Sequence, residues 1–295
     1  MSALDNAYAE CRRIALGHYE NFPVGSLLVP RKLRKHFFAL YAFMRSADDF
    51  ADLPHRPNDE RLRLLQDWRV KLHSIYDATT PVDPIFLALQ DTIQKFDLPR
   101  APFDRLLDAF EFDALGEVRF ETYDDLHWYT KRSAEPVGQL VLALFGYRDA
   151  ERIAWSNDIC AALQLLNFLQ DAKEDLSAAR YYFPREVFRQ FGIAKEEDII
   201  SSPKSGDLVL QECDRIEQIL MNGIPLIESV GGRLRLELRA VVSGAKLMLG
   251  KIRAMDGRTT EARPKLSTFE KKRILFDAMK KSPSFSRRGP EGGGV

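Results

Sequence analysis

The sequence predicts an all-α protein whose helices form a single bundle. Apolar residues recur with the 3.6-residue period of amphipathic helices along the whole chain. The chain has only 17 glycines in 295 residues, and it has few stretches in which Val, Thr or Ile alternate with polar residues as they do in strands. Hydrophobic residues make up 45% of the sequence, which is enough for a sizeable core. We therefore expect one helical domain over residues 1–282.

Prolines and glycines divide the periodic pattern into separate helices, because proline cannot continue a helix and glycine favours its end. The predicted helices cover residues 5–20, 31–53, 59–77, 84–96, 101–116, 124–145, 148–177, 184–191, 205–230, 233–255 and 269–281. Residues 283–295 are rich in Ser, Arg, Gly and Pro, and we expect a disordered tail there.

The charge pattern excludes some functions and locates one basic segment. Lys plus Arg and Asp plus Glu each number 43, so the net charge of zero gives no reason to expect nucleic-acid binding. The balance is uneven, since residues 258–295 hold ten basic and four acidic side chains. The segment 269–281 mixes these basic residues with apolar ones. It is therefore a candidate for peripheral contact with an anionic membrane, although a solvated helix packed on the bundle explains the pattern equally well.

The cysteines and the chain start favour a cytoplasmic protein. Cys11, Cys160 and Cys213 lie far apart, which indicates neither a disulfide framework nor a zinc cluster. The first residues lack the basic and apolar regions of a signal peptide. No apolar stretch reaches the roughly 18 residues that a membrane-spanning helix needs. We expect a cytoplasmic location, with the inner membrane as the one candidate surface for contact.

The predicted helix 31–53 carries the first candidate site. Tyr41, Arg45, Asp48 and Asp52 follow one another at helical spacings of four, three and four residues, so they share one stripe of the helix. Two carboxylates one turn apart repel each other. On an otherwise apolar helix such a pair needs a cation or an arginine as its partner.

The predicted helix 148–177 repeats the pattern. Gln164, Asn167, Asp171 and Asp175 form a polar stripe at spacings of three, four and four, between Leu, Ala, Phe and Ile. Either aspartate pair alone fits a solvated face or an intrahelical ion pair. Two such pairs on apolar helices indicate a site for hard divalent cations, with Mg²⁺ bridging carboxylates and a diphosphate that leaves during the reaction. A di-iron bundle is excluded, because it needs Glu-x-x-His motifs that the chain lacks.

These motifs resemble the squalene/phytoene synthase family, the head-to-head branch of the all-α isoprenyl diphosphate synthases. The likeness covers residues 10–260 approximately. It rests on five segments in the family's order: 18–22 (His-Tyr-Glu-Asn-Phe), 41–52 (Tyr-Ala-Phe-Met-Arg-Ser-Ala-Asp-Asp-Phe-Ala-Asp), 129–138 (Tyr-Thr-Lys-Arg-Ser-Ala-Glu-Pro-Val-Gly), 164–175 (Gln-Leu-Leu-Asn-Phe-Leu-Gln-Asp-Ala-Lys-Glu-Asp) and 180–184 (Arg-Tyr-Tyr-Phe-Pro). The resemblance implies an isoprenoid synthase helical bundle with a central cavity for a prenyl diphosphate.

The resemblance also implies roles for individual residues. The Mg²⁺ ligands would be Asp48, Asp52, Asn167, Asp171 and Asp175, and the phosphate contacts Arg45, Arg180 and Tyr181. Tyr129 would lie near the developing carbocation, while His18, Tyr41 and Gln164 would line the substrate site. Alternatives remain for single residues: Arg45 could pair with Asp48 or Asp49, Tyr129 could be an ordinary half-buried tyrosine, and Phe22, Phe37, Phe43, Phe50 and Phe168 could belong to the core.

Two departures from the family pattern bear on the substrate. Gln170 stands where the family usually has an arginine, and Glu20 replaces a cation or a small polar residue. Both changes remove positive charge that would help to bind a second diphosphate, unless Gln170 faces away from the pocket. The Asn-Phe-x-Gln-Asp pattern of 167–171 resembles the hydroxysqualene synthase (HpnC-type) branch of bacterial hopanoid biosynthesis.

That resemblance implies a reaction that needs no hydride donor. Presqualene diphosphate would ionise, its cyclopropylcarbinyl cation would rearrange, and water would capture it to give hydroxysqualene. One alternative is a condensing squalene or phytoene synthase that joins two prenyl diphosphates. Another is a non-catalytic helical assembly factor with the same fold, although such relatives usually lose the aspartates.

Overall fold

The structure, a computed structural model, describes residues 2–17, 29–53, 55–77, 79–116 and 118–280, and most of these residues are helical. Its helices are α1 (Ala3–Gly17), α2 (Arg31–Ala51), α3 (Asn58–Tyr76), α4 (Pro84–Phe96), α5 (Ala101–Ala114), α6 (Tyr123–Ser133), α7 (Glu135–Leu144), α8 (Ala150–Gln170), α9 (Ala172–Ser177), α10 (Arg185–Gln190), the 3₁₀ helix η1 (Glu196–Ile200), α11 (Ser205–Gly223), α12 (Pro225–Ser229), α13 (Gly232–Ala254) and α14 (Thr268–Met279). The described residues form no strand beyond one isolated bridge between Arg119 and Tyr181. The all-α prediction is confirmed.

Three of the predicted helices are interrupted in the structure. The helix predicted over 124–145 breaks at Ala134, and the one over 205–230 breaks at Ile224, in both cases just before a proline. Proline lacks an N–H and its ring clashes with the carbonyl four residues earlier, so neither helix can continue unbroken. The helix predicted over 148–177 bends at Asp171, whose ψ of 9° leaves the helical range. The 3₁₀ turn η1 was not predicted.

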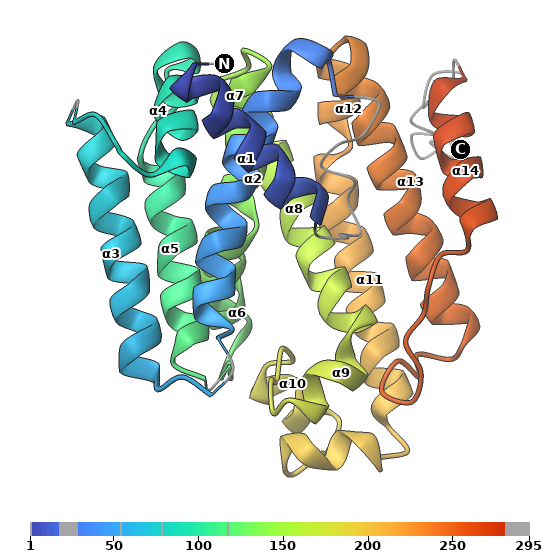
Figure 1. The fold of residues 1–295 in the computed structure, drawn as a ribbon. Coiled ribbons are helices and arrows are strands. Elements are labelled where there is room, and N and C mark those ends of the chain that lie inside the picture. Colours follow the sequence, from blue (N-terminus) through green and yellow to red (C-terminus); the bar gives the residue numbers. More distant parts are fainter. Residues whose placement is uncertain (1, 18–28, 54, 78, 117, 281–295) are drawn as a thin grey trace.

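The helix α8 lies at the middle of the bundle (Figure 1), and α7 and α11 pack closely against it. A Cβ atom at Gly138 of α7 would come within 2.6 Å of the Ser156 and Cys160 side chains of α8. A Cβ at Gly223 of α11 would come equally close to the backbone of α8 at Trp155. Only glycine permits these approaches, so α7 and α11 pack directly on α8.

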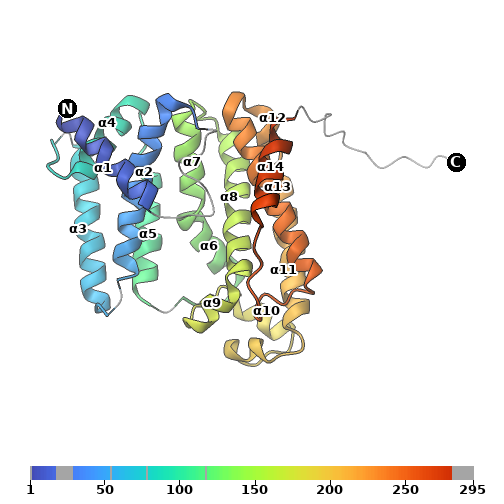
Figure 2. The ribbon, with the colours of Figure 1, turned by 45° about the vertical axis from the view of Figure 1, so that its right-hand side comes forward.

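The two largest clusters of the apolar core differ in the helices that form them. Side chains of α2, α3, α4, α5 and α7 fill one part, and those of α8, α11 and α13 fill the other. Figure 2 shows the upright helices of both parts, with α9 and α10 at the lower end below α8 and α11. The helices α2 and α8 both end toward that lower end in Figure 1, so their C-terminal residues lie at the same end of the bundle. The tail predicted for 283–295 lies outside the described residues.

Candidate active site

The first aspartate pair lies at the C-terminal end of α2. The guanidinium of Arg45 donates to Asp48 (Nη1 to Oδ2, 3.2 Å) and to Asp49 (Nη2 to Oδ1, 2.6 Å). Asp52 is the residue that ends the helix, and its backbone N–H donates to the Asp48 carbonyl at 3.0 Å. The ion pair that the sequence left as an alternative for Arg45 is therefore present, in the stripe where the metal ligands were predicted.

The second pair lies where α8 passes into α9. The N–H of Asp171 donates to the Asn167 carbonyl, and the N–H of Asp175 donates to the Asp171 carbonyl, so the helical spacing continues through the bend. Burial raises the pKa of Asp171, against the opposing charge of Arg263. Burial, and next the charge of Asp171, raise the pKa of Asp175 to about 7. A carboxylate with this environment is stabilised by a nearby cation.

Arg180 connects the two pairs. Its Nη2 donates to Asp52 Oδ1 at 2.6 Å, across 128 positions of sequence. Its backbone N–H donates to the Asp175 carbonyl at 2.9 Å, and its charge opposes the rise in the pKa of Asp175. The structure therefore brings the two predicted aspartate pairs to one place, with a guanidinium between them.

Arg263 is a site residue that the sequence analysis missed. It lies in the segment 256–267 that joins α13 to α14, and its Nε donates to Asp171 Oδ1 at 2.5 Å. The same segment is fixed on both sides of Asp171, because Lys173 donates to the Glu261 carbonyl and Gln170 donates to the Pro264 carbonyl. A lone arginine in a segment without helical periodicity gives no sequence signal for such a contact.

The remaining predicted residues divide into those near the carboxylates and those elsewhere. Gln164 and Asn167 are half-buried on α8. Gln170 is buried, and its amide Nε2 donates a hydrogen bond to the Pro264 carbonyl oxygen at 3.0 Å. Tyr181 is buried in the core, where its N–H donates to the Val118 carbonyl and Arg119 lies over its ring. Its contact with phosphate stays a prediction. His18, Glu20 and Phe22 lie outside the described residues.

Tyr129 is buried in a cluster of aromatic rings. The rings whose centroids lie within 6.2 Å of the Tyr129 ring are those of Phe112, Phe120, Phe168 and Tyr182. The Phe168 and Tyr182 rings stack on each other with centroids 3.8 Å apart. The Tyr129 hydroxyl donates to the carboxylate of Asp113, at 3.0 Å from Oδ1 and 2.9 Å from Oδ2.

Asp113 is the second site residue that the sequence analysis missed. Burial raises its pKa to about 7, while the hydrogen bond from Tyr129 and the charge of Arg180 act in the opposite direction. A signal for it existed in the sequence. Asp113 follows Leu106 and Ala109 at helical spacing, and those two residues are fully buried, so a carboxylate interrupts the apolar stripe of α5.

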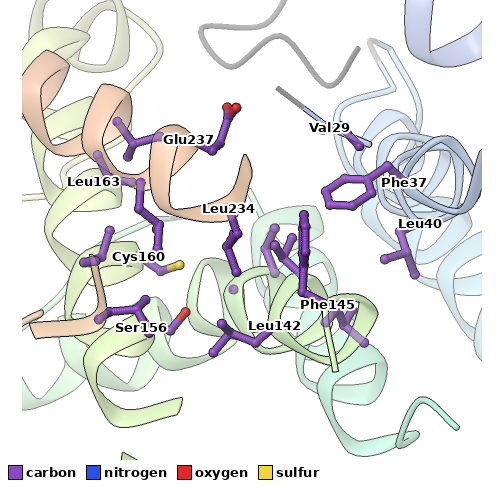
Figure 3. Close-up of a pocket in the computed structure, with 18 of the residues that line it drawn as sticks. Val29, Phe37, Leu40, Leu142, Phe145, Ser156, Cys160, Leu163, Leu234 and Glu237 are labelled. Atoms are coloured by element: carbon purple, nitrogen blue, oxygen red, sulfur yellow. The ribbon is translucent and has the colours of Figure 1, made fainter. Parts of the chain in front are cut away.

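An apolar cavity of about 290 Å³ lies between α2, α7, α8 and α13. Figure 3 shows Phe37 and Leu40 of α2 on one side, Ser156, Cys160 and Leu163 of α8 on another, and Leu234 of α13 between them. Tyr41 and Met44, which lie four residues and one residue before Arg45 in α2, also line the cavity. Because a helix rises about 1.5 Å per residue, Asp48 lies only about 10 Å along α2 from Tyr41. Both α2 and α8 therefore pass from a cavity wall to a pair of carboxylates.

The residues fit a hard divalent cation by their chemistry, since every predicted ligand atom is oxygen. Among the described residues no three Asp, Glu, His or Cys side chains form a ready-made metal cluster. Asp48, Asp52 and Asp171 each accept from an arginine through one of their two carboxylate oxygens.

The chain is similar to known proteins over most of its length. The sequence profile of the squalene/phytoene synthase family matches residues 16–270. The presqualene diphosphate synthases of Rhodopseudomonas palustris and Sinorhizobium fredii are 34% and 33% identical over 61% and 67% of this chain. These alignments span 63% and 69% of the two relatives. A phytoene synthase of Mycobacterium tuberculosis is 28% identical over 96% of this chain and 93% of its own.

Solved structures show the same fold. The squalene synthase HpnC of Alicyclobacillus acidocaldarius is 36% identical, with a TM-score of 0.79 over 86% of this chain and 95% of its own. A dehydrosqualene synthase, 23% identical, superposes with a TM-score of 0.81 over 93% of this chain and 96% of its own. At this identity the likeness shows a shared fold only. The profile match covers both aspartate pairs, Tyr129, Arg180 and Arg263. The chain belongs to the squalene/phytoene synthase family.

Proposed function

We propose that the protein converts presqualene diphosphate to hydroxysqualene and diphosphate. The observation that carries this proposal is that α2 and α8, which line an apolar cavity, both lead to an aspartate pair, with Arg180 between the two pairs. A prenyl diphosphate has one anionic and one hydrocarbon end, and this arrangement offers a matching partner for each. The carbon–oxygen bond breaks with both electrons leaving on the diphosphate, the cation rearranges, and water adds to it with loss of one proton.

The side chains would divide the work as follows. Bound Mg²⁺ would neutralise charge on the leaving diphosphate, held by Asp48, Asp52, Asn167, Asp171 and Asp175. The guanidinium groups of Arg45, Arg180 and Arg263 would exchange their carboxylate partners for phosphate oxygens, which suit the fixed donor geometry of arginine. The apolar walls around Phe37 and Leu163 would hold the hydrocarbon and keep bulk water away from the cation.

Two facts support presqualene diphosphate as the substrate. The second motif, with Gln170 before Asp171, resembles the HpnC-type branch, and the squalene synthase HpnC is 36% identical over most of the chain. The neutral Gln170 side chain does not, however, leave Asp171 without a guanidinium. Gln170 is buried against Pro264, and Arg263 brings a guanidinium to Asp171 from another segment. Any influence of Gln170 on substrate choice would act through the position of that segment.

A condensing reaction on two prenyl diphosphates is the second candidate. The names of the relatives favour it, since two are presqualene diphosphate synthases and another is a phytoene synthase. Arg263 favours it as well, because it adds positive charge beside the second aspartate pair. Separate incubations with presqualene diphosphate and with farnesyl diphosphate in Mg²⁺, followed by mass spectrometry, distinguish the two reactions. A chain that consumes neither would be the non-catalytic assembly factor.

We also propose that α14 contacts an anionic membrane surface from the cytoplasmic side. Phe269, Phe276 and Met279 are 74%, 56% and 61% exposed, whereas Ala278 on the opposite side of α14 is buried. Lys272 lies on the exposed side with them at helical spacing. No described helix is long and apolar enough to cross a bilayer. An exposed apolar face with basic residues suits the boundary between lipid headgroups and acyl chains, where a C30 product would dissolve.

A further inference from the structure

The last turn of α2 is held from outside by a side chain of α3. The Nη1 of Arg61 donates to the Ala51 carbonyl at 2.8 Å, and its Nη2 donates to the Oδ1 of Asn58. The Nδ2 of Asn58 donates in turn to the Leu115 carbonyl at 2.7 Å. Ala51 is the last residue of α2, and Leu115 is the residue that ends α5. Two side chains in the first turn of α3 therefore join the C-terminal ends of two other helices, at the lower left in Figure 1.

Arg61 satisfies a group that the end of α2 leaves without a partner. The last four carbonyls of a helix accept no hydrogen bond from within it, and a cation beside them also interacts favourably with the helix dipole. Helix α3 is a fixed support for this contact. Its Trp68 ring packs edge-on against the Phe50 ring of α2, with centroids 5.3 Å apart, and its Leu65 is fully buried. A well-packed helix thus holds a helix end that would otherwise fray.

The carbonyl that Arg61 holds belongs to the same peptide plane as the backbone nitrogen of Asp52. Because a peptide unit is planar, fixing the Ala51 oxygen fixes the direction of the Asp52 N–H and the place of the Asp52 Cα atom. That N–H donates to the Asp48 carbonyl at 3.0 Å, which fixes the same plane from its other side. The Asp52 side chain is 47% exposed. Its position therefore depends on these hydrogen bonds and on the ion pair with Arg180 more than on packing.

We propose that Arg61, itself held by Asn58, is a positioning residue for the first aspartate pair. It fixes the end of α2 so that the Asp52 carboxylate faces Arg180 and the second pair. This inference rests on the proposed function, which assigns Asp52 to the metal. A guanidinium has no lone pair to offer a hard cation, so Arg61 acts on metal binding through the Ala51 carbonyl. Loss of a group that orients a metal ligand typically lowers metal affinity or activity about ten- to a hundredfold.

The central test measures metal binding without turnover. The probe is Mn²⁺ added with inorganic diphosphate, followed by the EPR signal of the free ion. Arg61→Met keeps an unbranched apolar stem but loses both donated hydrogen bonds, and its Mn²⁺ affinity should fall at least about tenfold. Arg61→Lys keeps one cationic donor for the Ala51 carbonyl and should recover part of the loss. Arg63→Met changes an exposed arginine of the same helix and should bind Mn²⁺ as the wild type does. Wild-type affinity in Arg61→Met would overturn the proposal.

The Mg²⁺ dependence of the rate separates positioning from a general loss of structure. In Arg61→Met the Mg²⁺ concentration that gives the half-maximal rate should rise about tenfold, and excess Mg²⁺ should restore most of kcat. A variant that is merely less folded contains fewer active molecules, which lowers kcat at every Mg²⁺ concentration and leaves the half-maximal concentration unchanged. That second result would also overturn the positioning role.

Asn58 provides a test that leaves Arg61 in place, and it covers the case in which Arg61→Met does not fold. Asn58→Ala removes the acceptor of the second Arg61 hydrogen bond and should weaken Mn²⁺ binding by a smaller factor than Arg61→Met. Because Asn58 acts through Arg61, the double variant should bind Mn²⁺ no more weakly than Arg61→Met alone. Additive losses, or wild-type affinity in Asn58→Ala, would contradict the proposal.

The same measurements distinguish failure of this inference from failure of the proposed function. A wild type that binds Mn²⁺ with diphosphate but consumes no prenyl diphosphate contradicts the proposed function, while the affinities of the Arg61 variants still decide the positioning role. A wild type that binds no Mn²⁺ contradicts both.

Discussion

Arg180 joins Asp52 across the site, with its Nη2 2.6 Å from the Asp52 Oδ1 atom. Asp52 ends α2 and Arg180 follows α9, so this contact ties the first aspartate pair to the second. Both side chains are partly exposed, and the ion pair by itself adds little to stability. The ion pair matters for its position, since it holds the guanidinium that would bind phosphate among the carboxylates that would hold the metal.

Removing one aspartate of either pair should abolish most of the activity. We expect Asp48→Ala or Asp171→Ala to lower turnover by at least about a hundredfold, because the remaining oxygens no longer fix the metal against the leaving diphosphate. Initial rates with and without excess EDTA measure the effect. Asp67→Ala, an exposed aspartate of α3, is the control. Near wild-type rates in either site variant, or full activity in EDTA, would contradict the metal site.

Neutralising Arg263 should weaken substrate binding. Arg263→Met removes one charged hydrogen bond to the diphosphate, worth about 1.5 to 3 kcal/mol, so kcat/KM should fall roughly ten- to hundredfold. Arg13→Met in α1, which removes an exposed arginine paired with Glu10, should leave kcat/KM unchanged. Unaltered kinetics in Arg263→Met would mean that its contact with Asp171 is only structural.

The parts of this site that the sequence predicted are those with helical spacing. Asp48, Asp52, Asp171 and Asp175 could be placed on two stripes because helix geometry fixes which residues share a face. Their approach to each other could not be predicted, since it depends on Arg180 and on how α2 and α8 pack.

The site residues that the sequence analysis missed either belong to no periodic pattern or stand in a pattern of apolar residues. Arg263 reaches Asp171 from a segment 92 positions away, and only the folded chain brings them together. Tyr181 and Tyr182 are neighbours, yet one lies in the core and the other in the aromatic cluster, because the backbone of Tyr181 is fixed on Val118. The bend at Asp171 is likewise absent from the 3.6-residue pattern, which continues through it.

The stability of the metal-free protein should depend on Asp113 and pH. Its pKa is about 7 in the folded protein and about 4 in an unfolded chain, so the folded state holds a proton that unfolding releases between these values. This contribution to the free energy of unfolding is fully present below about pH 4 and is lost as the pH rises through about 7.

Asp113→Asn removes that dependence. The difference in free energy of unfolding between wild type and variant should change by up to about 1.4 kcal/mol per pH unit between pH 4.5 and 6.5, to the disadvantage of the wild type at higher pH. Asp175 makes a pH-dependent contribution of the same sign to the stability of both proteins, so its contribution cancels in the difference between them. Urea denaturation in EDTA at several pH values measures the free energy of unfolding of both proteins. If the two free energies change with pH in parallel, Asp113 has an ordinary pKa in the folded protein.

Membrane contact should depend on the exposed face of α14. A variant with Phe269, Phe276 and Met279 all replaced by Ser should sediment with phosphatidylglycerol vesicles much less than the wild type, because each buried apolar side chain contributes about 1.5 to 3 kcal/mol. Val70→Ser combined with Val82→Ser removes two exposed apolar residues elsewhere and should sediment normally. Equal binding of all three proteins would exclude α14 as the contact.

Gln170 and Arg263 together should determine whether the protein prefers a substrate with one diphosphate or binds two prenyl diphosphates. The neutral Gln170 side chain fixes the Pro264 carbonyl and so holds Arg263 on Asp171, where it can serve one diphosphate with its metals. If the site holds only one diphosphate, presqualene diphosphate should have a kcat/KM at least about a hundredfold above that of farnesyl diphosphate, equivalent to two charged hydrogen bonds.

In Gln170→Arg, a guanidinium replaces the buried amide beside Arg263. If it turns toward the site, it adds charge for a second diphosphate, and the preference for presqualene diphosphate should shrink at least tenfold. Gln170→Met is the control, since it breaks the contact with Pro264 without adding charge, and any loss of preference that it shares with Gln170→Arg comes from displacement of the segment 256–267. If the wild type condenses farnesyl diphosphate as readily as it consumes presqualene diphosphate, Arg263 already supplies the charge that the second diphosphate needs, and the condensing reaction is the function of this site.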